Sequence, residues 1–430
     1  AAGATQTGFG RTGTVDWETS IQTGTVTAAT GKGYFVNTTA GAITVNLPAG
    51  VVGSIVAVSD YASTAASNNI TVEPNGSEKI NAVNDGYVMS TAGLAVTLVY
   101  ADATRGWKSV TGSDADATGL VPAFIVATGG TPCSGAIVCT NYKVHTFTGP
   151  GTLCVSCAGN SLGSNSVDYM VVAGGGGGAA GPGGAGAGAG GFREGYNPGS
   201  YTASPLATTA LPVTAQGYPI DVGAGGAGGT GGPEGFNTPQ GVDGSNSIFS
   251  TITSTGGGRG AGAAANPCGG LAGDGGAGGG GANGLSNGSG NTPAVSPSQG
   301  FDGAADGANP GAGGGATATN GTNTTDGGAG ATTCISATPT AYAGGGGAGA
   351  AGNTCIPTSP RSPLGGGVGG TGGGGSGAKG APSGGSAPDA GVGTINTGGG
   401  GGGAGRQESV TNRSGGLGGS GIVIIRYKFQ

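Results

Sequence analysis

The chain has 430 residues, of which 109 are Gly and 22 are Pro, and only 8% are charged. This much Gly and Pro without a strict period is typical of disordered chains, but those combine high charge with low hydrophobicity, whereas 35% of these residues are hydrophobic. The net charge is −6 and the 14 basic residues are scattered, so nucleic acid and anionic membranes are not expected as partners.

The first segment, residues 1–30, is short and polar and contains two aromatic side chains, Phe9 and Trp17. One interpretation is an attachment arm, in which these two side chains insert into a partner and join the chain to a larger particle. The other is a flank that folds onto its own domain. The residues alone leave both interpretations open.

Residues 31–112 have the pattern of an ordinary all-β domain, with apolar stretches separated by turn residues. In AVTLVYAD, for example, Val96, Leu98 and Tyr100 alternate with smaller or polar neighbours, as a half-buried strand requires. No amphipathic helix of useful length is visible. The segment therefore predicts a small β-sandwich or β-barrel. The expected strands lie in GYFVNTTAGAITVNLP, GSIVAVSDYA, NNITVEPNGS, GLAVTLVYAD and RGWKSVTGS.

A linker is expected over residues 113–132 and a β-hairpin region over 133–172. DADATG in the linker has the start of a calcium loop, but Ile125 stands where the bidentate Glu of an EF-hand is needed, so an EF-hand is excluded. His145 lies in the strand-like segment YKVHTFTG without the partners of a catalytic or metal site. We expect it to be structural.

The remainder, residues 173–430, consists of glycine runs punctuated by short apolar strands. A run such as GGGGGAAGPGGAGAGAGG breaks the Gly-X-Y rule, so the chain is not a collagen. Ordered glycine runs are expected to form extended helices of the polyglycine II or polyproline II type, which lack internal hydrogen bonds and must bond laterally. Only glycine lets backbones approach that closely.

The apolar stretches are expected to anchor these packed helices. In the final strand, 421–430, Val423, Ile425 and Tyr427 lie on one face, whereas Ile422 and Ile424 share the other with Arg426. VDYMVVA at 167–173 has the same character, so we expect the two strands to lie near one another. The predicted fold is thus an all-β N-terminal part followed by a glycine-rich domain with short β anchors and essentially no α-helix.

The seven cysteines fall mostly into local pairs: Cys133 with Cys139, Cys154 with Cys157, and Cys334 with Cys355, leaving Cys268 over. Short-loop disulfides between them are an expectation that spacing alone does not prove. CVSC has the spacing of half a zinc site, but no second ligand pair stands nearby. Carboxylates such as Asp168, Asp221 and Asp243 are spread singly, so no catalytic, cofactor or metal site is predicted.

Several segments together resemble known proteins. GKGYFVNTTAGAITVNLPAG, NNITVEPNGSEKI and VTLVYADATRGW are similar to the N-terminal region of fibre proteins from phages of marine bacteria, especially cyanophages. HTFTGPGTL, VDYMVVAGGGGGAAGPGG and GGSGIVIIRYKFQ look like the glycine-rich domain of phage tail-fibre and adhesin proteins. The extra cysteines are not part of that pattern.

The resemblance implies a virion fibre, homotrimeric, whose N-terminal part binds other virion proteins and whose glycine-rich part faces the host. Some adhesins of this kind present variable loops from a lattice of polyglycine II helices. The expected partner is a host-surface glycan or protein, with no nucleic acid and no membrane insertion.

Under this interpretation, loops between glycine helices carry recognition. Aromatic residues are expected to stack on sugar rings or fill protein pockets, and arginines to meet anionic surface glycans. The alternative is that the aromatics cap the bundle and the arginines keep it soluble. The candidates are Tyr196, Tyr201, Phe236, Phe301, Arg361, Arg406 and Arg413.

Two other function classes remain open. One is an extracellular filament or matrix protein of a cell, in which open β edges join subunits into a polymer. The other is a head or neck fibre of a virion with no receptor of its own. No arrangement in the sequence favours an enzyme.

Overall fold

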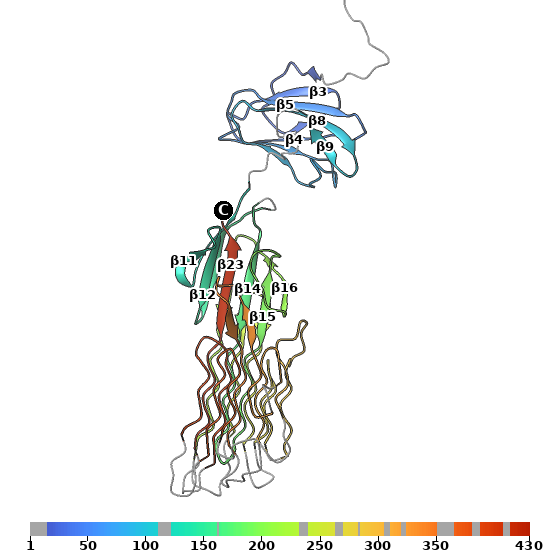
Figure 1. Cartoon of the computed structure of the whole chain (residues 1–430). Coiled ribbons are helices and arrows are strands. Elements are labelled where there is room, and N and C mark those ends of the chain that lie inside the picture. Colours follow the sequence, from blue (N-terminus) through green and yellow to red (C-terminus); the bar gives the residue numbers. More distant parts are fainter. Residues whose placement is uncertain are drawn as a thin grey trace, which may run out of the picture. The chain divides into compact units, whose positions relative to one another are not determined.

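The computed structural model describes residues 15–110, 122–160, 163–231, 240–262, 270–282, 284–304, 310–319, 324–350, 365–380, 388–406 and 413–430. The chain divides into two compact units, residues 1–121 and 122–430 (Figure 1). Their regular elements are β-strands, and none of the residues in those ranges forms a helix, so none of them belongs to an apolar helix that could cross a membrane. The predicted all-β fold without α-helix is confirmed for this part of the chain.

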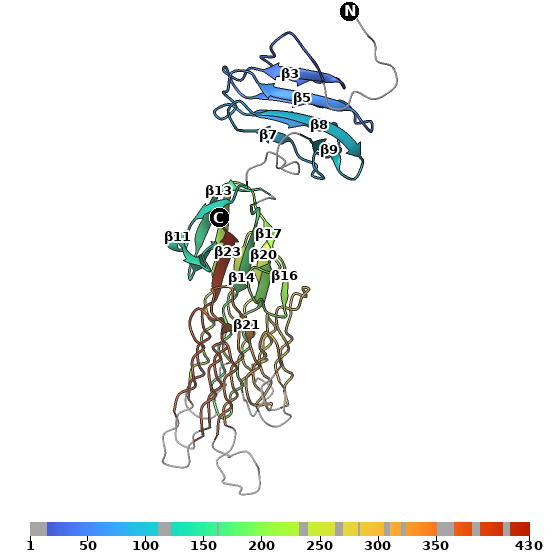
Figure 2. The same ribbon diagram turned by 45° about the horizontal axis from the view of Figure 1, so that its top comes forward.

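The first unit is a sandwich of two sheets, with strand orders β1-β3-β5-β8-β9 and β2-β4-β6-β7. Figure 2 shows β3, β5 and β8 lying side by side in the first sheet. The strands are β1 (Asp16–Trp17), β2 (Val26–Thr27), β3 (Lys32–Val36), β4 (Ile43–Asn46), β5 (Ile55–Asp60), β6 (Ile70–Glu73), β7 (Tyr87–Met89), β8 (Ala95–Asp102) and β9 (Gly106–Ser109).

The core of this unit forms between the two sheets because successive strands alternate between them from β2 to β6. This alternation makes β3 parallel to β5 and β4 parallel to β6. The inward side chains of β8, Val96, Leu98 and Tyr100, are buried, which confirms the predicted alternation. Trp107 is completely buried and lies edge-on to Tyr100, with 5.6 Å between ring centroids.

The segment predicted as an arm is partly a piece of this sandwich. Asp16 and Trp17 form β1, which pairs in parallel with β3, and the Trp17 ring stacks on Phe35 at 4.5 Å. Trp17 therefore covers its own domain, which differs from the predicted insertion into a partner, although 39% of the residue stays exposed. Phe9 lies outside the described residues.

The second unit begins with a second sandwich, whose sheets are ordered β10-β13-β18-β19-β20 and β11-β12-β23-β14-β15-β16. A short strand, β17, pairs with β14, and β21 and β22 form a separate hairpin. The strands are β10 (Ile125–Thr128), β11 (Thr131–Val138), β12 (Tyr142–Phe147), β13 (Gly151–Ala158), β14 (Ser166–Val172), β15 (Phe192–Tyr196), β16 (Ala207–Thr209), β17 (Leu211–Pro212), β18 (Gly217–Asp221), β19 (Ser247–Phe249), β20 (Ile252–Ser254), β21 (Ala331–Thr333), β22 (Thr340–Tyr342) and β23 (Ile422–Lys428).

The C-terminal strand β23 lies in the middle of the larger sheet, between β12 and β14. Val423, Ile425 and Tyr427 belong to the core between the two sheets, whereas Ile422 and Ile424 belong to a second core on the other face. The predicted division of faces and the predicted proximity of 167–173 to the C-terminal strand are both confirmed.

The predicted boundaries at the start of this unit differ from the structure. Strand β10 and the first residues of β11 lie inside the predicted linker, 113–132, and Ile125 is only 1% exposed. Ile125 and Ala127 alternate with exposed neighbours over only four residues, a pattern too short to separate from a polar linker. The predicted hairpin region, 133–172, is likewise distributed over both sheets.

Glycine runs extend from the end of this sandwich and return to it, and their hydrogen bonds recur every three residues. In the run 173–180, amides three residues apart donate to the same neighbouring run. The bonds are Gly174 to Ser245 and Gly177 to Val242, Gly175 to Gly419 and Gly178 to Gly416, and Gly176 to Gly188 and Ala179 to Ala185. A period of three residues is that of a polyproline II-type helix.

The carbonyls of the same run accept from three further runs, so it is bonded to six neighbours. The donors are Gly257 and Gly260, Gly226 and Gly229, and Gly401 and Ala404. This packing requires glycine, because a Cβ at position 177 would lie only 1.9 Å from the carbonyl oxygen of Ala227. The runs therefore form a hydrogen-bonded lattice held by backbone atoms.

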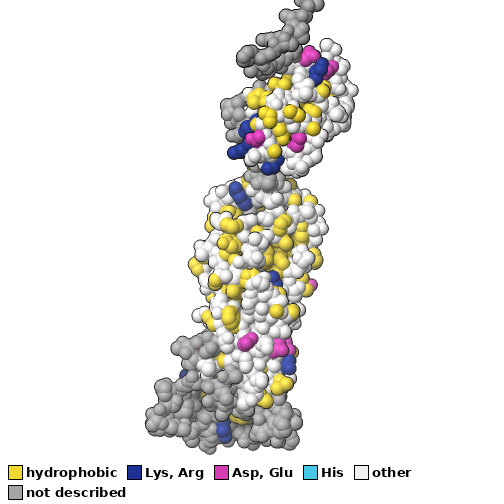
Figure 3. All heavy atoms as spheres, turned by 90° about the vertical axis from the view of Figure 1, so that its right-hand side faces the viewer, with side chains coloured by type: hydrophobic (Ala, Val, Ile, Leu, Met, Phe, Trp, Pro, Cys, Tyr) yellow, Lys and Arg dark blue, Asp and Glu magenta, His cyan; other side chains and the backbone are white. Residues whose placement is uncertain are grey.

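The outer run 221–230 of this glycine lattice carries side chains where it faces solvent. Along residues 221–230 the burial repeats every three residues, with Ala224, Ala227 and Thr230 exposed and Gly226 and Gly229 buried. In the view of Figure 3, uncharged and backbone atoms make up most of the described surface of the glycine runs.

Candidate functional site

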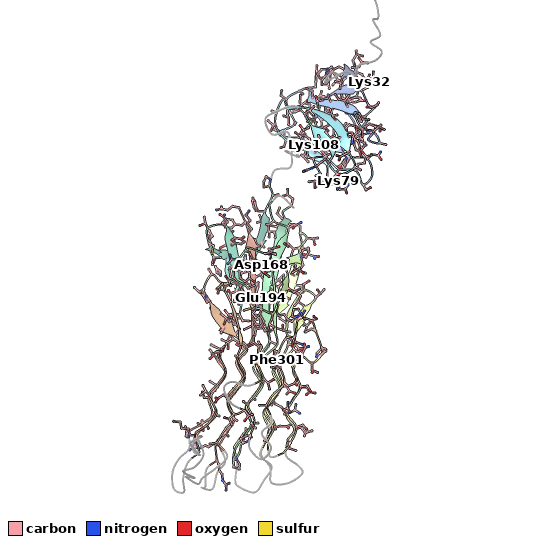
Figure 4. The ribbon with its side chains drawn as sticks, turned by 45° about the vertical axis from the view of Figure 1, so that its right-hand side comes forward. Lys32, Lys79, Lys108, Asp168, Glu194 and Phe301 are labelled. Carbon is pink, nitrogen blue, oxygen red and sulfur yellow. The ribbon has the colours of Figure 1, made fainter. Side chains whose placement is uncertain are left out.

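The predicted recognition residues lie in different parts of the second unit. Tyr196 and Tyr201 belong to the sandwich, whereas Arg406 and Arg413 lie where glycine runs end on the side away from it. Figure 4 shows Phe301 in the part of the glycine runs next to the sandwich. Phe236 and Arg361, like Cys268 and Cys355, lie outside the described residues. The structure thus does not gather the described candidates into one site.

The remote ends of the runs carry basic side chains. Arg406 is exposed, and its backbone amide donates to the Ala350 carbonyl at 2.9 Å. Lys379 is also exposed, at the end of a neighbouring run. The guanidinium of Arg413 lies 3.4 Å from the carboxylate of Asp389. Exposed cations at this end can meet an anionic surface, whereas Arg413 already has an acidic partner.

Phe301 is 40% exposed and its backbone belongs to the lattice. Its amide donates to the Gly315 carbonyl at 3.1 Å and its carbonyl accepts from Gly278 at 3.0 Å. The backbone therefore holds this ring in place close to the sandwich, away from Arg406. A ligand that bridges Phe301 and Arg406 would have to span the length of the runs.

A buried polar cluster crosses the middle of the larger sheet. Asp168 on β14 faces Arg426 on β23 in register, and Glu194 lies on the next strand, β15. All three side chains are at most 1% exposed. In Figure 4, Asp168 and Glu194 lie together in the sandwich. Sequence reasoning missed this cluster because its members are scattered along the chain and only strand pairing joins them.

Hydrogen bonds satisfy most of the charges in this cluster. Asp168 Oδ1 accepts from the backbone amide and from Nδ2 of Asn197, at 2.7 and 2.9 Å. Arg426 donates to the carbonyls of Ser200 and Ile335, at 2.8 and 3.2 Å, and its guanidinium stacks 4.3 Å from the centre of the Tyr142 ring. Burial raises the pKa of Asp168 to about 6, although the bonds from Asn197 and the charge of Arg426 oppose the rise.

Tyr201 is part of this cluster. Its hydroxyl donates to Glu194 Oε1 at 2.9 Å, and Arg426 lies 5.2 Å from its ring centroid. Burial and the neighbouring carboxylate of Glu194 raise the pKa of Tyr201 far above its usual range. Its ring and hydroxyl are thus engaged inside the chain, which differs from the predicted receptor contact. Tyr196 lies edge-on to it, at 5.9 Å between ring centroids.

His145 is completely buried on β12. Nδ1 lies 2.7 Å from the Gly129 carbonyl and Nε2 lies 3.1 Å from the Tyr427 hydroxyl, so both ring nitrogens have partners. Burial is the main cause that lowers its pKa. The geometry is that of a structural residue. Nor do three His, Cys, Asp or Glu side chains converge on a metal-binding arrangement anywhere in the described ranges.

A polar cavity lies beside the cluster, at the end of the sandwich away from the glycine runs. It has a volume of about 230 Å³ and opens between the starts of β12 and β14 and the end of β23. No motif in the sequence marked its residues, because strand pairing brings Tyr142 opposite Lys428. It is lined by Tyr142, Gly163, Ser164, Asn165, Ser166, Asn197 and Lys428.

The described cysteines are free thiols. Cys133 lies near the start of β11 and Cys139 directly follows its end, and Cys154 and Cys157 stand three residues apart on the extended strand β13. Three residues of strand span roughly 10 Å, beyond the roughly 7 Å limit between Cα atoms of a disulfide. The two local disulfides expected from spacing are therefore absent. Cys334 is free and half-buried.

Comparison with known protein families agrees with the glycine lattice. A model of a glycine-rich domain matches residues 147–428, well over half of the chain. A search of curated proteins finds no match. The matched region contains most of the larger sheet and every glycine run. The chain therefore belongs to the glycine-rich domain family.

Proposed function

We propose that this chain is a structural fibre protein of a virion, similar to tail-fibre and adhesin proteins of phages of marine bacteria. In this role the glycine lattice holds connecting segments toward the host surface. The observation that supports it best is the run 173–180, which is bonded to six neighbours and so has no freedom to bend independently.

The lattice suits display because backbone hydrogen bonds fix its runs, so that segments joining the runs start and end at fixed positions. Between Gly231 and Gln240, for example, the chain leaves one run and enters the next in the opposite direction. Segments at such reversals are rich in polar residues and Pro, as in IPTSPRSPL and RQESVTNR. Loops on rigid scaffolds tolerate variation and keep their position.

The proposed partners are a host-surface glycan or protein at the remote ends of the runs, and other virion proteins at the N-terminal part. Homotrimeric assembly and location on an external appendage of the virion belong to the same proposal. Multiple copies would compensate for weak single contacts by about 10²-fold or more.

Immunogold electron microscopy tests the proposal on culture lysates and intact cells, with antibody against residues 133–430. We expect gold at the distal ends of particle appendages. Gold on a head or neck fibre would retain the virion role and remove the receptor role. Gold along cell-attached filaments would overturn the virion role.

An adsorption assay tests the receptor role separately. Purified chain should compete with virions for host cells, and Arg406→Ala should weaken this competition several-fold if the remote ends meet an anionic surface. Arg105→Ala, at an exposed position of the first unit, is the matched control. Phe236→Ala and Phe301→Ala, made singly, show whether either ring contributes. Unchanged competition in all variants would contradict the assignment.

An extracellular filament of a cell is the second candidate, and the edge strand β11 favours it. Six of its eight residues are exposed, including Ile137 at 63%. An exposed edge is a template for pairing with another chain. Growth of filaments by purified protein, abolished by Ile137→Lys, would favour this candidate over a virion fibre.

A further inference from the structure

The cavity beside Asp168 has the size and chemistry of a site for one small polar ligand. Its side chains come from three places that the sheet brings together: Tyr142 on β12, Ser164 to Ser166 at the start of β14, and Lys428 on β23. Its volume of about 230 Å³ lies below the roughly 300–1,000 Å³ of drug-sized pockets. A single ring-sized ligand fits such a space.

Asn197 is held in position at this cavity by the buried cluster. Its backbone amide and Nδ2 both donate to Asp168 Oδ1, and its Oδ1 accepts from Ser166 Oγ at 3.0 Å. An amide group has two donor hydrogens and an oxygen that accepts twice, so one of each remains after these bonds. A preorganised donor and acceptor side by side is the arrangement that recognises vicinal hydroxyl groups.

The other lining groups add donors and acceptors. Ser164 Oγ donates to the Lys428 carbonyl at 2.7 Å and accepts from the Ile125 amide at 3.3 Å, which leaves its oxygen able to accept one further bond. Asn165 is exposed and brings a second carboxamide. The ammonium of Lys428 lies 5.4 Å from the Phe124 ring centroid, which restrains it at the rim.

The charges around the cavity favour a neutral ligand. Lys428 is the basic residue of the lining, and beneath it the buried positive charge of Arg426 is accompanied by the carboxyl groups of Asp168 and Glu194. There is therefore no excess of positive charge to select an anion. Burying a charged group costs free energy of desolvation. The role of Asp168 in holding Asn197 in position gives a reason for a carboxyl group at this buried position.

From this arrangement we infer that the cavity binds a neutral hexose-sized sugar unit, held by Asn165, Asn197, the two serine hydroxyls and Lys428. This site is separate from the segments at the remote ends of the glycine runs. Loss of host adsorption in the Arg406 variant and loss of sugar binding here would be independent results.

Saturation-transfer NMR on the full chain tests the site with methyl glucoside, methyl galactoside, methyl mannoside, N-acetylglucosamine and glucuronic acid. We expect a neutral sugar to bind, and Asn165→Ala with Lys428→Met to weaken it about tenfold or more, since each removes hydrogen bonds. The double variant Asn75→Ala with Arg105→Met, at exposed positions of the first unit, is the matched control.

Three outcomes would overturn the inference: no sugar binds, only glucuronic acid binds, or a neutral sugar binds the wild-type chain and the Asn165/Lys428 variant equally. The last result would place the sugar elsewhere on the chain. Asn197→Asp provides a second check, because it replaces the whole NH2 group with an acceptor of similar shape and so removes the free donor together with the bond to Asp168 Oδ1. Undiminished binding in that variant would also contradict the site.

Discussion

Arg426 shows how one side chain joins distant parts of the fold. It is fully buried, it donates to carbonyls of Ser200 and Ile335, and it lies between the rings of Tyr142 and Tyr201. Burying charged groups is weak evidence for stability, because the cost of desolvation offsets their attraction. Arg426 has a more specific effect on the register between β14 and β23. Only one alignment of these two strands places its guanidinium opposite Asp168.

The raised pKa of Asp168 predicts a pH dependence of the second unit. Because the folded state binds this proton more tightly than the unfolded state, its contribution is fully present below the ordinary pKa of 3.8 and is lost as pH rises through about 6. Asp168→Asn should remove this loss. Relative to wild type, the free energy of unfolding of the variant should rise by about 2–2.5 kcal/mol between pH 4 and pH 7.

Denaturant titrations of the wild-type chain and Asp168→Asn between pH 4 and pH 7 measure the difference in their free energies of unfolding. His145 has a lowered pKa and destabilises the fold as pH falls, but it is present in both proteins and cancels in the comparison. Asp221→Asn, at an exposed position of β18, is the control. If the difference in free energy of unfolding between the wild-type chain and Asp168→Asn does not change with pH, the prediction is wrong.

The free thiols predict which cysteines react with an alkylating reagent. Cys133, Cys139, Cys154 and Cys157 are exposed, so iodoacetamide should alkylate all four in the native chain, and the half-buried Cys334 should react more slowly. Peptide mapping by mass spectrometry under non-reducing conditions measures the extent at each position. A linked Cys133–Cys139 or Cys154–Cys157 peptide would show instead that the spacing-based expectation is right.

Among the elements, the outer glycine runs follow a simple rule that connects sequence to position. In GAGGAGGT, residues 223–230, the residues other than glycine recur every third position, and the structure exposes all three, Ala224, Ala227 and Thr230. The central run 173–180 contains only Gly and Ala because it has neighbours on every side. The spacing of larger side chains thus distinguishes an outer run from an inner one.

This rule predicts that substitutions at two adjacent residues change the stability of the second unit by very different amounts. A Cβ at position 226 would lie 1.9 Å from the Val242 carbonyl oxygen, so Gly226→Ala should destabilise the second unit by about 3 kcal/mol, as overpacking does. Ala227→Ser, one residue further and exposed, should change stability by less than about 0.5 kcal/mol. Thermal unfolding of the two variants measures both changes in stability. Equal losses of stability in the two variants would contradict the rule.

Local patterns predicted some elements and missed others for physical reasons. The two faces of β23 were predictable because strand alternation is visible within seven residues. Strand β10 was missed because four residues are too few to show a period. The cavity and the Asp168 cluster were not predictable at all, because Tyr142, Asn197 and Lys428 meet only through the pairing of strands far apart in the sequence. The recognition role of the loops stays a prediction.

For the whole molecule, the separation into two units has a direct spectroscopic consequence. The chain contains two Trp residues, Trp17 and Trp107, and both belong to the first unit. The second unit has cores of its own, on the two faces of the larger sheet. Tryptophan fluorescence therefore reports on the first unit, whereas calorimetry detects both.

Arg426→Met tests whether the units unfold separately. Removing this cation leaves Asp168 and Glu194 buried without it, a change that costs about 3–5 kcal/mol, so the calorimetric transition of the second unit should fall by several degrees. The midpoint of the Trp fluorescence transition should stay where it is in the wild-type chain, as it should in the exposed control Arg105→Met. If the fluorescence midpoint falls together with the calorimetric one, the two units unfold as a single cooperative body. A disturbance in the second unit would then be transmitted to the first unit.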